Sequence, residues 1–323
     1  MLRVISSADV RALYSINDTL PAMRQALIDF SNGSAYQHPR VTVEPPGEGG
    51  MVLLMPAASG GQLGLKLLSM FPRAGERGLA SVQGLVVLLD AVYGEPLAIL
   101  DATTVTEIRT AAVTAVATDA LARPDASGLA VIGAGVQAKG HIQALAPVRP
   151  WKFIRLYSRS AERAQALAAW SGDQGVEVEI TESASAAVRD ADVICTATSA
   201  CEPVLADEDV AKPGVHISAV GAFGPSCREL PTDLIGRARL FVDSRQAALS
   251  EAGDLVVPLR NGTITENSIV AEIGEVLAGA AGRLDNELTV FKSLGLPIQD
   301  AVACAAIYQR AVRQDVGTSV EFP

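Results

Sequence analysis

Residues 133 to 138 form a GxGxxA motif, Gly-Ala-Gly-Val-Gln-Ala, of the kind that binds the diphosphate of a dinucleotide. Gly133 permits a tight turn, Gly135 lets the backbone approach the diphosphate, and Ala138 allows a helix to pack closely on a strand. The apolar run "GLAVIG" leads into the motif, and a helical pattern follows from about Val136. Because free N–H groups at a helix start attract anions, we expect a dinucleotide here; a purely structural glycine turn is the alternative.

The residues after the next expected strand, "KFIRLYS", indicate which dinucleotide is bound. An acid at this place would bond the 2′-hydroxyl of NAD and repel the 2′-phosphate of NADP. This chain has Ser158, Arg159 and Ser160 instead, with Arg163 one turn later. Hydroxyl and guanidinium groups suit a phosphate, so we expect NADPH, with NADH as the other option. A solvated helix start with incidental arginines is the alternative.

Two later segments follow the fourth and fifth expected strands of the same sheet. They are "TATS", residues 196 to 199, and "AVGAFGPSCREL", residues 219 to 230. Ligands of such sheets bind at the carboxyl ends of the strands. We therefore expect Gly221 and Phe223 to face the reacting end of the cofactor, whereas "TATS" is equally consistent with an ordinary exit from a strand.

Three cations in the N-terminal part have apolar neighbours. Arg40 follows "HP", Lys66 interrupts the strand "LGLKLLSMF", and Arg109 lies in the apolar helix "TEIRTAAVTAV". A lysine within a strand is usually the outward residue of an alternating pattern. Arg109 has apolar flanks, and a buried guanidinium needs an anionic partner, for which a substrate carboxylate would serve.

The elements that must position these residues fall into two groups. Short β-rich runs punctuated by Gly and Pro come first and indicate an antiparallel sheet or partial barrel. A long helix then begins at Thr104, where "TVTE" reads as a capping box, and ends at Arg123-Pro124. Strands and helices alternate after it, which predicts a doubly wound parallel sheet. The last helix, "LPIQDAVACAAIYQRAVRQ", is expected to return to the first part.

Composition excludes several classes of protein. A length of 323 residues favours two domains, and a net charge of −10 argues against a nucleic-acid or anionic-membrane partner. The first residues lack the apolar core of a signal peptide, so we expect a cytoplasmic protein. The cysteines, Cys195, Cys201, Cys227 and Cys304, show no metal-ligand spacing with the histidines. We expect four free buried thiols, no metal site and no catalytic histidine.

The stretches "PRV", "LMPA", "GLKLLSMFP", "EIRTAA", "VIGAGVQA" and "LTVFKSLGLPIQD" occur in this order along the chain. Together they resemble the ornithine cyclodeaminase/mu-crystallin family over nearly the whole length. The resemblance implies an NAD(P)-binding Rossmann domain, residues 116–288, inserted in an α+β substrate-binding and dimerisation domain formed by residues 1–115 and 289–323. It also implies a homodimer.

The resemblance also implies roles for individual positions. Lys66 and Arg109 match the catalytic cations, and substrate contacts are expected from Arg40, Met55, Lys66, Ser81, Arg109 and Phe223. Cofactor contacts are expected from Thr110, Gly133, Gly135, Val136, Gln137, Ser158, Arg159, Ser160, Arg163, Thr196, Ala197, Thr198, Ser199, Val220, Gly221, Lys292 and Ser293.

Three positions depart from the cyclodeaminase pattern. Phe223 stands where cyclodeaminases and related archaeal alanine dehydrogenases carry an aspartate that handles the substrate amino group. Leu53 replaces a glutamate, and Lys292 occupies the place of the aspartate in "FDS", as in ketimine-reducing mu-crystallins. Without the aspartate a substrate ammonium has no partner, whereas a cyclic imine needs only an anchored carboxylate and one proton.

The expected function is therefore NADPH-dependent reduction of a cyclic ketimine acid in proline metabolism. The substrate would be Δ1-pyrroline-2-carboxylate, or Δ1-piperideine-2-carboxylate, and the product L-proline or L-pipecolate. Lys66 is the candidate proton donor, with a pKa that falls beside two arginines. The alternatives are ornithine cyclodeamination, alanine dehydrogenation, or nucleotide-dependent binding of a small molecule without chemistry.

Overall fold

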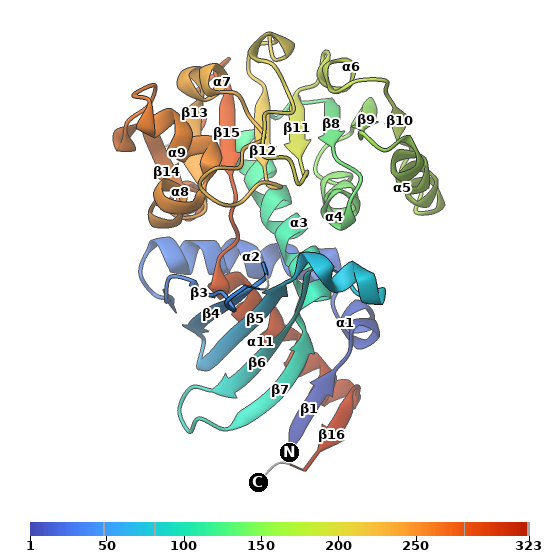
Figure 1. Ribbon diagram of the computed structural model, residues 1–323, viewed down its shortest axis with the longest axis vertical. Helices are drawn as coiled ribbons and strands as arrows, with labels where there is room; N and C mark the ends of the chain where they lie inside the picture. The colour runs from blue at the N-terminus through green and yellow to red at the C-terminus, as the bar shows by residue number, and fades with distance from the viewer. Residues whose placement is uncertain (48, 81, 281, 322–323) are drawn as a thin grey trace. The chain divides into compact units, whose positions relative to one another are not determined.

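The computed structural model describes all residues of the chain except 48, 81, 281 and 322–323. The chain divides into two units, Met1–Arg109 with Gly295–Pro323 and Thr110–Leu294 (Figure 1). The first unit combines a mainly antiparallel sheet with helices, and the second is built on a parallel sheet. The expected α/β class, with a Rossmann sheet inserted in an α+β unit, is confirmed.

The first unit contains an eight-stranded sheet in the order β16-β1-β7-β6-β5-β4-β2, with β3 paired to β4. All pairs are antiparallel except β1 with β7. Its strands are β1 (Leu2–Ile5), β2 (Tyr36–Gln37), β3 (Val41–Val43), β4 (Met51–Ser59), β5 (Gln62–Met70), β6 (Val82–Asp90), β7 (Pro96–Asp101) and β16 (Thr318–Val320). Its helices are α1 (Ser7–Leu13), α2 (Ile16–Ser31), α11 (Pro297–Gln314) and the 3-10 turn η1 (Pro72–Arg77).

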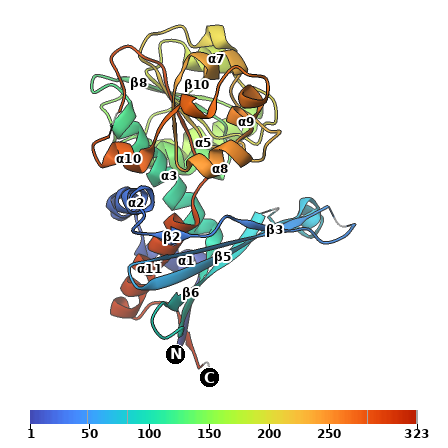
Figure 2. The same cartoon turned by 90° about the vertical axis from the view of Figure 1, so that its left-hand side faces the viewer.

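Helix α11 packs on one face of this sheet, chiefly against β4 and β5, and α2 packs on α11 (Figure 2). A Cβ on Gly64 of β5 would lie 2.7 Å from the Cβ of Ala301 in α11, so the even-numbered residues of β5 face this helix. Lys66 therefore points inward and is not the outward residue that a lysine within a strand usually is. The odd-numbered residues of β5 point to the opposite face.

Helix α3 (Ala102–Leu121) connects the first unit to the second along the chain. The expected capping box at Thr104 is wrong, because the helix begins earlier and Asp101 Oδ1 accepts the N–H of Thr104 at 2.8 Å. Glu107, the other half of the expected box, instead pairs with Arg11 at 2.6 Å. The side chain of Thr104 also has a tertiary partner, the hydroxyl of Ser7 at 2.7 Å, so neither residue caps the helix.

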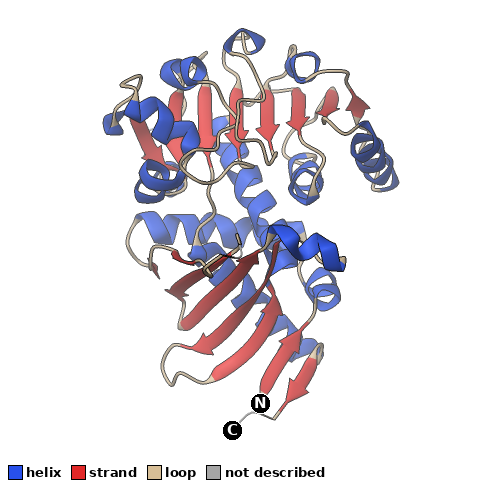
Figure 3. Ribbon diagram, viewed as in Figure 1, coloured by secondary structure: helices blue, strands red, loops and turns tan. Residues whose placement is uncertain are grey.

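The second unit contains an eight-stranded parallel sheet in the order β10-β9-β8-β11-β12-β15-β13-β14 (Figure 3). Its strands are β8 (Gly128–Ile132), β9 (Phe153–Tyr157), β10 (Glu179–Ile180), β11 (Val193–Thr196), β12 (His216–Ala219), β13 (Arg239–Val242), β14 (Ile269–Glu272) and β15 (Thr289–Lys292). The helices are α4 (Val136–Leu145), α5 (Ala161–Asp173), α6 (Ala184–Val188), α7 (Thr232–Arg237), α8 (Arg245–Glu251), α9 (Gly253–Arg260) and α10 (Ile273–Leu277), with 3-10 turns η2 (Asp207–Asp209) and η3 (Glu266–Ser268).

The strand order reverses between β8 and β11. From β8 the chain moves outward through β9 to β10, and it then returns to place β11 on the other side of β8. Loops diverge at such a point, and nucleotides bind outside the carboxyl ends of the strands there. The loop after β8 contains Gly133 to Gly135, and the loop after β11 begins at Ala197, so the fold brings the two expected nucleotide segments to this place.

Strand β15 shows where the expected domain boundary differs from the structure. The expected returning segment 289–323 includes its residues, but β15 pairs with β12 and β13 inside the parallel sheet. The run "LTVF" is buried on both sides, as a central parallel strand requires.

Among the described residues no helix is long and apolar enough to cross a membrane.

Candidate active site

The glycine loop of the second unit has the backbone that its sequence predicts. Gly133 has φ +121°, and a Cβ there would lie 2.4 Å from the carbonyl oxygen of Ala197. Gly135 is the N-cap of α4 with φ −91°, and no side chain caps this helix. A Cβ on Gly135 would meet nothing within 4 Å, so the space in front of the helix N–H groups is open. Val136 is 58% exposed beside it. This geometry suits a diphosphate.

Three expected cofactor residues of this unit carry buried polar atoms without a hydrogen-bond partner in the described part of the chain. They are the hydroxyl oxygens of Thr110 and Thr196 and the amide oxygen of Gln137. Native folds leave few such atoms unsatisfied, and each one calls for an explanation. A polar ligand at the carboxyl edge of the sheet would supply the missing partners, so these residues fit a dinucleotide.

A buried carboxylate holds the loops that follow β11 and β12. Glu229 accepts hydrogen bonds from the N–H and hydroxyl of Thr198 at 2.8 and 2.7 Å. It also accepts the N–H groups of Gly221 and Ala222 at 2.7 and 3.2 Å. A Cβ on Gly221 would lie 2.1 Å from the Thr198 carbonyl oxygen, so only glycine permits this approach. Next to these bonded residues, Ser199 is exposed and Val220 is half-buried.

Lys292 and Ser293, expected at the nicotinamide end, are both buried. The ammonium of Lys292 pairs with Asp254 at 2.8 Å and donates to the carbonyl oxygen of Ala222 at 2.6 Å. The hydroxyl of Ser293 donates to Asp243 at 3.3 Å. Lys292 therefore connects the end of β15 to the loop after β12.

The cysteines differ in part from the expectation of four free thiols. Cys195 and Cys304 are free and buried, but Cys201 and Cys227 form a disulfide. The two cysteines are 26 residues apart and follow β11 and β12. Sequence spacing could not reveal this pair, because the parallel neighbours β11 and β12 bring the two loops together only in the folded sheet.

The residues expected at the adenosine ribose follow β9. Ser160 is the N-cap of α5, and its hydroxyl accepts the N–H of Arg163 at 3.3 Å. The Ser158 hydroxyl accepts the N–H of Ser160 at 3.3 Å. The side chains of Arg159 and Arg163 are exposed and make no hydrogen bond or ion pair with any described residue. Two guanidinium groups without a bond to any described residue therefore lie at the start of α5.

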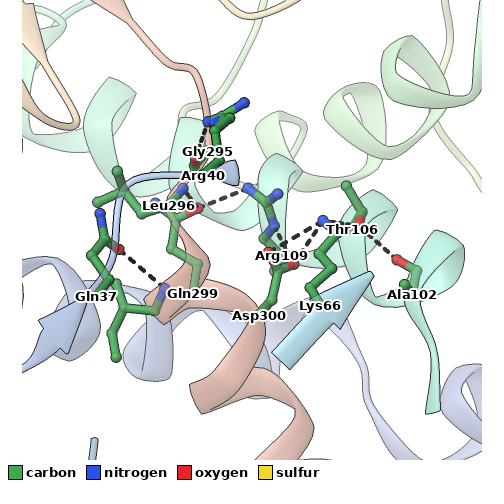
Figure 4. Close-up of polar contacts among 11 residues, drawn as sticks. Gln37, Arg40, Lys66, Ala102, Thr106, Arg109, Gly295, Leu296, Gln299 and Asp300 are labelled. Carbon is green, nitrogen blue, oxygen red and sulfur yellow. Dashed lines mark hydrogen bonds and ion pairs between the residues drawn. The ribbon is translucent and has the colours of Figure 1, made fainter. Parts of the chain in front are cut away.

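Lys66 of the first unit is only 2% exposed and lies in a polar cluster (Figure 4). Its ammonium donates to the Thr106 hydroxyl at 2.7 Å and is 3.2 Å from each carboxylate oxygen of Asp300. The two equal distances allow one shared hydrogen to serve both oxygens. In that arrangement, with one hydrogen shared by the two Asp300 oxygens and one donated to Thr106, the third N–H of the ammonium is left for a ligand. Met55 is the cross-strand neighbour of Lys66 and is buried beside it.

Arg109 is 4% exposed and already has an anionic partner within the chain. Its Nε donates to Asp300 Oδ1 at 2.9 Å, and its Nη1 donates to Gln299 Oε1 at 2.7 Å (Figure 4). The expectation that a buried Arg109 depends on a substrate carboxylate for its counter-charge is therefore wrong. Nη2 keeps no hydrogen bond to any described residue, so one edge of the guanidinium is available.

Three further residues are expected to contact the substrate, namely Arg40, Ser81 and Phe223. Arg40 Nη2 donates to the carbonyl oxygen of Gly295 at 2.9 Å, which places this guanidinium next to the start of α11. Ser81 lies outside the described residues. In the second unit Phe223 lies in the loop after β12 and is 41% exposed.

The titration behaviour of Lys66 follows mainly from burial. The pKa of Lys66 is lowered to about 8, mainly by desolvation and to a smaller extent by the nearby charges of Arg109 and Arg40. The Asp300 carboxylate opposes this effect. The expected fall is present, but the arginines are not its main cause. A lysine with this pKa exchanges its proton near neutral pH.

The histidines do not offer an alternative acid in the buried regions. Burial lowers the pKa of His141 to about 4 and that of His216 to about 3, so both imidazoles are neutral at pH 7. His141 is bonded to Thr114 and to the carbonyl oxygen of Gln137. His216 is bonded to Thr289 and Ser218. Both are satisfied core residues.

Sequence reasoning missed the residues that hold the cations. Asp300 and Gln299 are fully buried at the start of α11, and the Thr106 hydroxyl accepts a hydrogen bond from the Lys66 ammonium. Gly295 has φ +79°, and a Cβ there would lie 2.6 Å from Arg109 Nη1. The available signal was an acid and an amide on the apolar side of "LPIQDAVACAAI", since a carboxylate on a buried helix face requires a cation.

Comparison with known proteins supports this picture. Over residues 2–315 the chain matches the model of the ornithine cyclodeaminase/mu-crystallin family. It is 38% identical to a Δ1-pyrroline-2-carboxylate reductase of Bacillus cereus over 99% of each chain. It is 39% identical to the ketimine reductase mu-crystallin of Rattus norvegicus over 90% of each chain.

The fold also matches a solved structure throughout. The Δ1-pyrroline-2-carboxylate reductase of Thermococcus litoralis, in complex with NADH and L-proline, has a TM-score of 0.94 at 35% identity. The match covers 98% of this chain and 100% of that one. With its glycine loop at the switch point and its buried lysine and arginine on β5 and α3, this chain belongs to the ornithine cyclodeaminase/mu-crystallin family.

Proposed function

We propose that this protein reduces a cyclic ketimine acid with a nicotinamide dinucleotide, converting Δ1-pyrroline-2-carboxylate, and also Δ1-piperideine-2-carboxylate, to L-proline and L-pipecolate. The observation that carries the proposal is the buried cluster of Lys66, Arg109 and Asp300. In this cluster a lysine with a lowered pKa and the Nη2 group of the arginine are available to a ligand. Phe223 in place of an aspartate favours an imine over an amino acid. The names of the relatives point the same way.

The residues of the first unit supply charge and a proton. Arg109 Nη2, together with Arg40, binds the substrate carboxylate and fixes the ring. Lys66 donates a proton to the imine nitrogen and regains one from water. A bound dihydronicotinamide supplies the hydride that adds to the imine carbon. The C=N bond thus becomes a C–N single bond with one hydride and one proton added, and no other reactant is needed.

The direct test is an assay of NADPH oxidation with each cyclic imine between about pH 5 and 8, the range around neutrality in which such groups titrate. We expect consumption of NADPH with L-proline or L-pipecolate as the product. Retained NADPH binding without turnover of either imine would contradict the proposal. Ammonia release from ornithine, or pyruvate formation from alanine, would replace it with one of the alternative activities.

The preferred cofactor is proposed to be NADPH, supported by the free guanidinium groups of Arg159 and Arg163. A charge-assisted hydrogen bond contributes about 1.5–3 kcal/mol, so Arg159→Ser with Arg163→Ser should weaken NADPH binding by tenfold or more. NADH, which lacks the 2′-phosphate, serves as the internal control and should bind the variant as it binds the parent. Equal losses for both nucleotides in fluorescence titrations would contradict this assignment.

We also propose a homodimer formed through the second face of the first unit's sheet. No α-helix among the described residues packs on this face (Figure 2). In register it carries only aliphatic side chains over its centre, namely Leu54, Pro56, Leu63, Leu65, Leu67, Leu85, Val87, Leu89 and Ile99. Monomers rarely expose so continuous an apolar surface, and a second copy of the chain would cover it.

The dimer is tested by a charge in the middle of this face. Leu65→Glu places a carboxylate where it would be desolvated on association, so the variant should be a monomer that keeps its secondary structure. Light scattering after gel filtration measures the mass. Val92→Glu, at a site 73% exposed, is the control and should leave the mass unchanged. A dimeric Leu65→Glu variant would show that this face is not the interface.

A further inference from the structure

Asp300 is a carboxylate with an unusual number of positive neighbours. It lies in the first turn of α11 and is fully buried. Lys66 of β5 and Arg109 of α3 both bond to it, at 3.2 and 2.9 Å. Arg40 adds a third positive charge from the segment before β3, at the nearby carbonyl oxygen of Gly295. The one carboxylate of Asp300 therefore bonds two buried cations, Lys66 and Arg109.

The geometry also explains how Asp300 could orient the proton donor. Its carboxylate holds the Lys66 ammonium on one side while the Thr106 hydroxyl holds it on another. Thr106 donates in turn to the carbonyl oxygen of Ala102 at 2.6 Å, so its oxygen can only accept from the ammonium. The same carboxylate fixes Arg109 through Nε, and Nη2 makes no hydrogen bond to any described residue. A single side chain thus sets the direction of both groups.

We propose that Asp300 is a positioning residue for imine reduction. It keeps the Lys66 amine protonated and oriented toward the substrate, and it fixes the orientation of the Arg109 guanidinium relative to that amine. The inference rests on the proposed function. Asp300 is fully buried and accepts hydrogen bonds from Lys66 and Arg109, so in this proposal it acts on the substrate through these two cations. For the same reason it is not a substitute for the aspartate that is replaced by Phe223.

The direction of the pH effect follows from the charges around Lys66. Burial, Arg109 and Arg40 all lower the pKa of Lys66, and Asp300 is the group that raises it. Cys304, one turn along α11, is a further titratable neighbour, and burial raises the pKa of its thiol well above the usual value, so it stays neutral. Loss of the Asp300 charge would therefore move the Lys66 pKa to lower values, and the amine would lose its proton at lower pH.

The first experiment measures the pH dependence of kcat in Asp300→Asn. An opposite charge at this range shifts a pKa by about 1–3 units, so the high-pH limb of the profile should move down by at least one unit. Asp300→Glu keeps the charge and should restore the limb even if kcat falls. Thr106→Val removes a neutral acceptor from the same ammonium and should move the limb much less than Asp300→Asn.

The second experiment follows Lys66 without turnover. The chain has five lysines, Lys66, Lys139, Lys152, Lys212 and Lys292, so the spectrum of protein labelled with 13C at lysine Cε is simple. Lys66→Arg assigns the signal. We expect its titration midpoint to fall by at least one unit in Asp300→Asn and to stay near that of the parent in Asp300→Glu.

The outcomes separate this inference from the proposed function. An unchanged Lys66 midpoint in Asp300→Asn overturns it, as does an equal loss of kcat in both variants with the parent's pH profile. If Asp300→Asn does not fold, the inference requires Asp300→Glu to keep the parent's midpoint, and a shifted midpoint overturns it. A protein inactive on imines would contradict the proposed function, while the Lys66 titration midpoint would still show whether Asp300 raises the pKa of that amine.

Discussion

Lys66→Arg should fold and bind NADPH but lose most of its activity on cyclic imines. The guanidinium keeps the positive charge beside Asp300, yet it does not release a proton near neutral pH. Positioned acid catalysis contributes about 10²–10⁴ in rate, and we expect kcat to fall by an amount in this range. The measurement is kcat at saturating imine, with the Kd for NADPH determined separately by fluorescence.

Two further variants make this prediction sharp. Lys66→Met keeps the length of the side chain and removes both charge and proton, so it should be at least as impaired as Lys66→Arg. Lys152→Met removes an exposed lysine of the second unit and should be unchanged. If Lys66→Arg retained kcat within a few fold, Lys66 would be an electrostatic anchor for the carboxylate, and another group or water would deliver the proton.

Gly135→Ala should weaken NADPH binding by at least about tenfold, a change of about 1.4 kcal/mol in binding free energy, with only a small loss of stability from the less favourable N-cap residue. The φ of Gly135 is −91°, which any residue adopts, and a Cβ there meets no protein atom within 4 Å. The methyl group would instead enter the space in front of the α4 N–H groups, where the diphosphate is proposed to bind. Nucleotide titration and thermal unfolding measure the two effects.

Gly133→Ala is the matched control, because it should damage both properties. Its φ is +121°, and the added Cβ would lie 2.4 Å from the carbonyl oxygen of Ala197. Left-handed strain costs about 1–3 kcal/mol before the clash is counted, so unfolding should occur at lower temperature. Normal NADPH affinity in a stable Gly135→Ala variant would show that the nucleotide does not lie over this loop.

Much of the second unit could be predicted from local patterns. The order of strand, glycine turn and helix around Gly133 depends on neighbours in sequence, and apolar runs such as "GLAVIG" mark buried parallel strands directly. The place of strand β15 in this sheet could not be predicted, because the chain first forms β13 and β14 and only then inserts β15 between β12 and β13. Its pattern shows a buried strand, but no local signal says which sheet it joins.

The first unit shows the complementary limit. Lys66 and Arg109 could be singled out as charges in apolar surroundings, and this is a local property. Their counter-ion could not, because Asp300 is 191 residues beyond Arg109 and 234 beyond Lys66. The Cys201–Cys227 disulfide was missed for a similar reason, since neighbouring parallel strands bring its loops together.

The sequence by itself determined the class of fold, the glycine loop and the types of residue available for chemistry, because backbone preference and apolar periodicity act over a few residues. Only the tertiary structure decided which charges neutralise one another. A buried cation is not stabilised by solvent and needs an anionic partner from the protein. Here helix α11, from the far end of the chain, supplies that partner as Asp300.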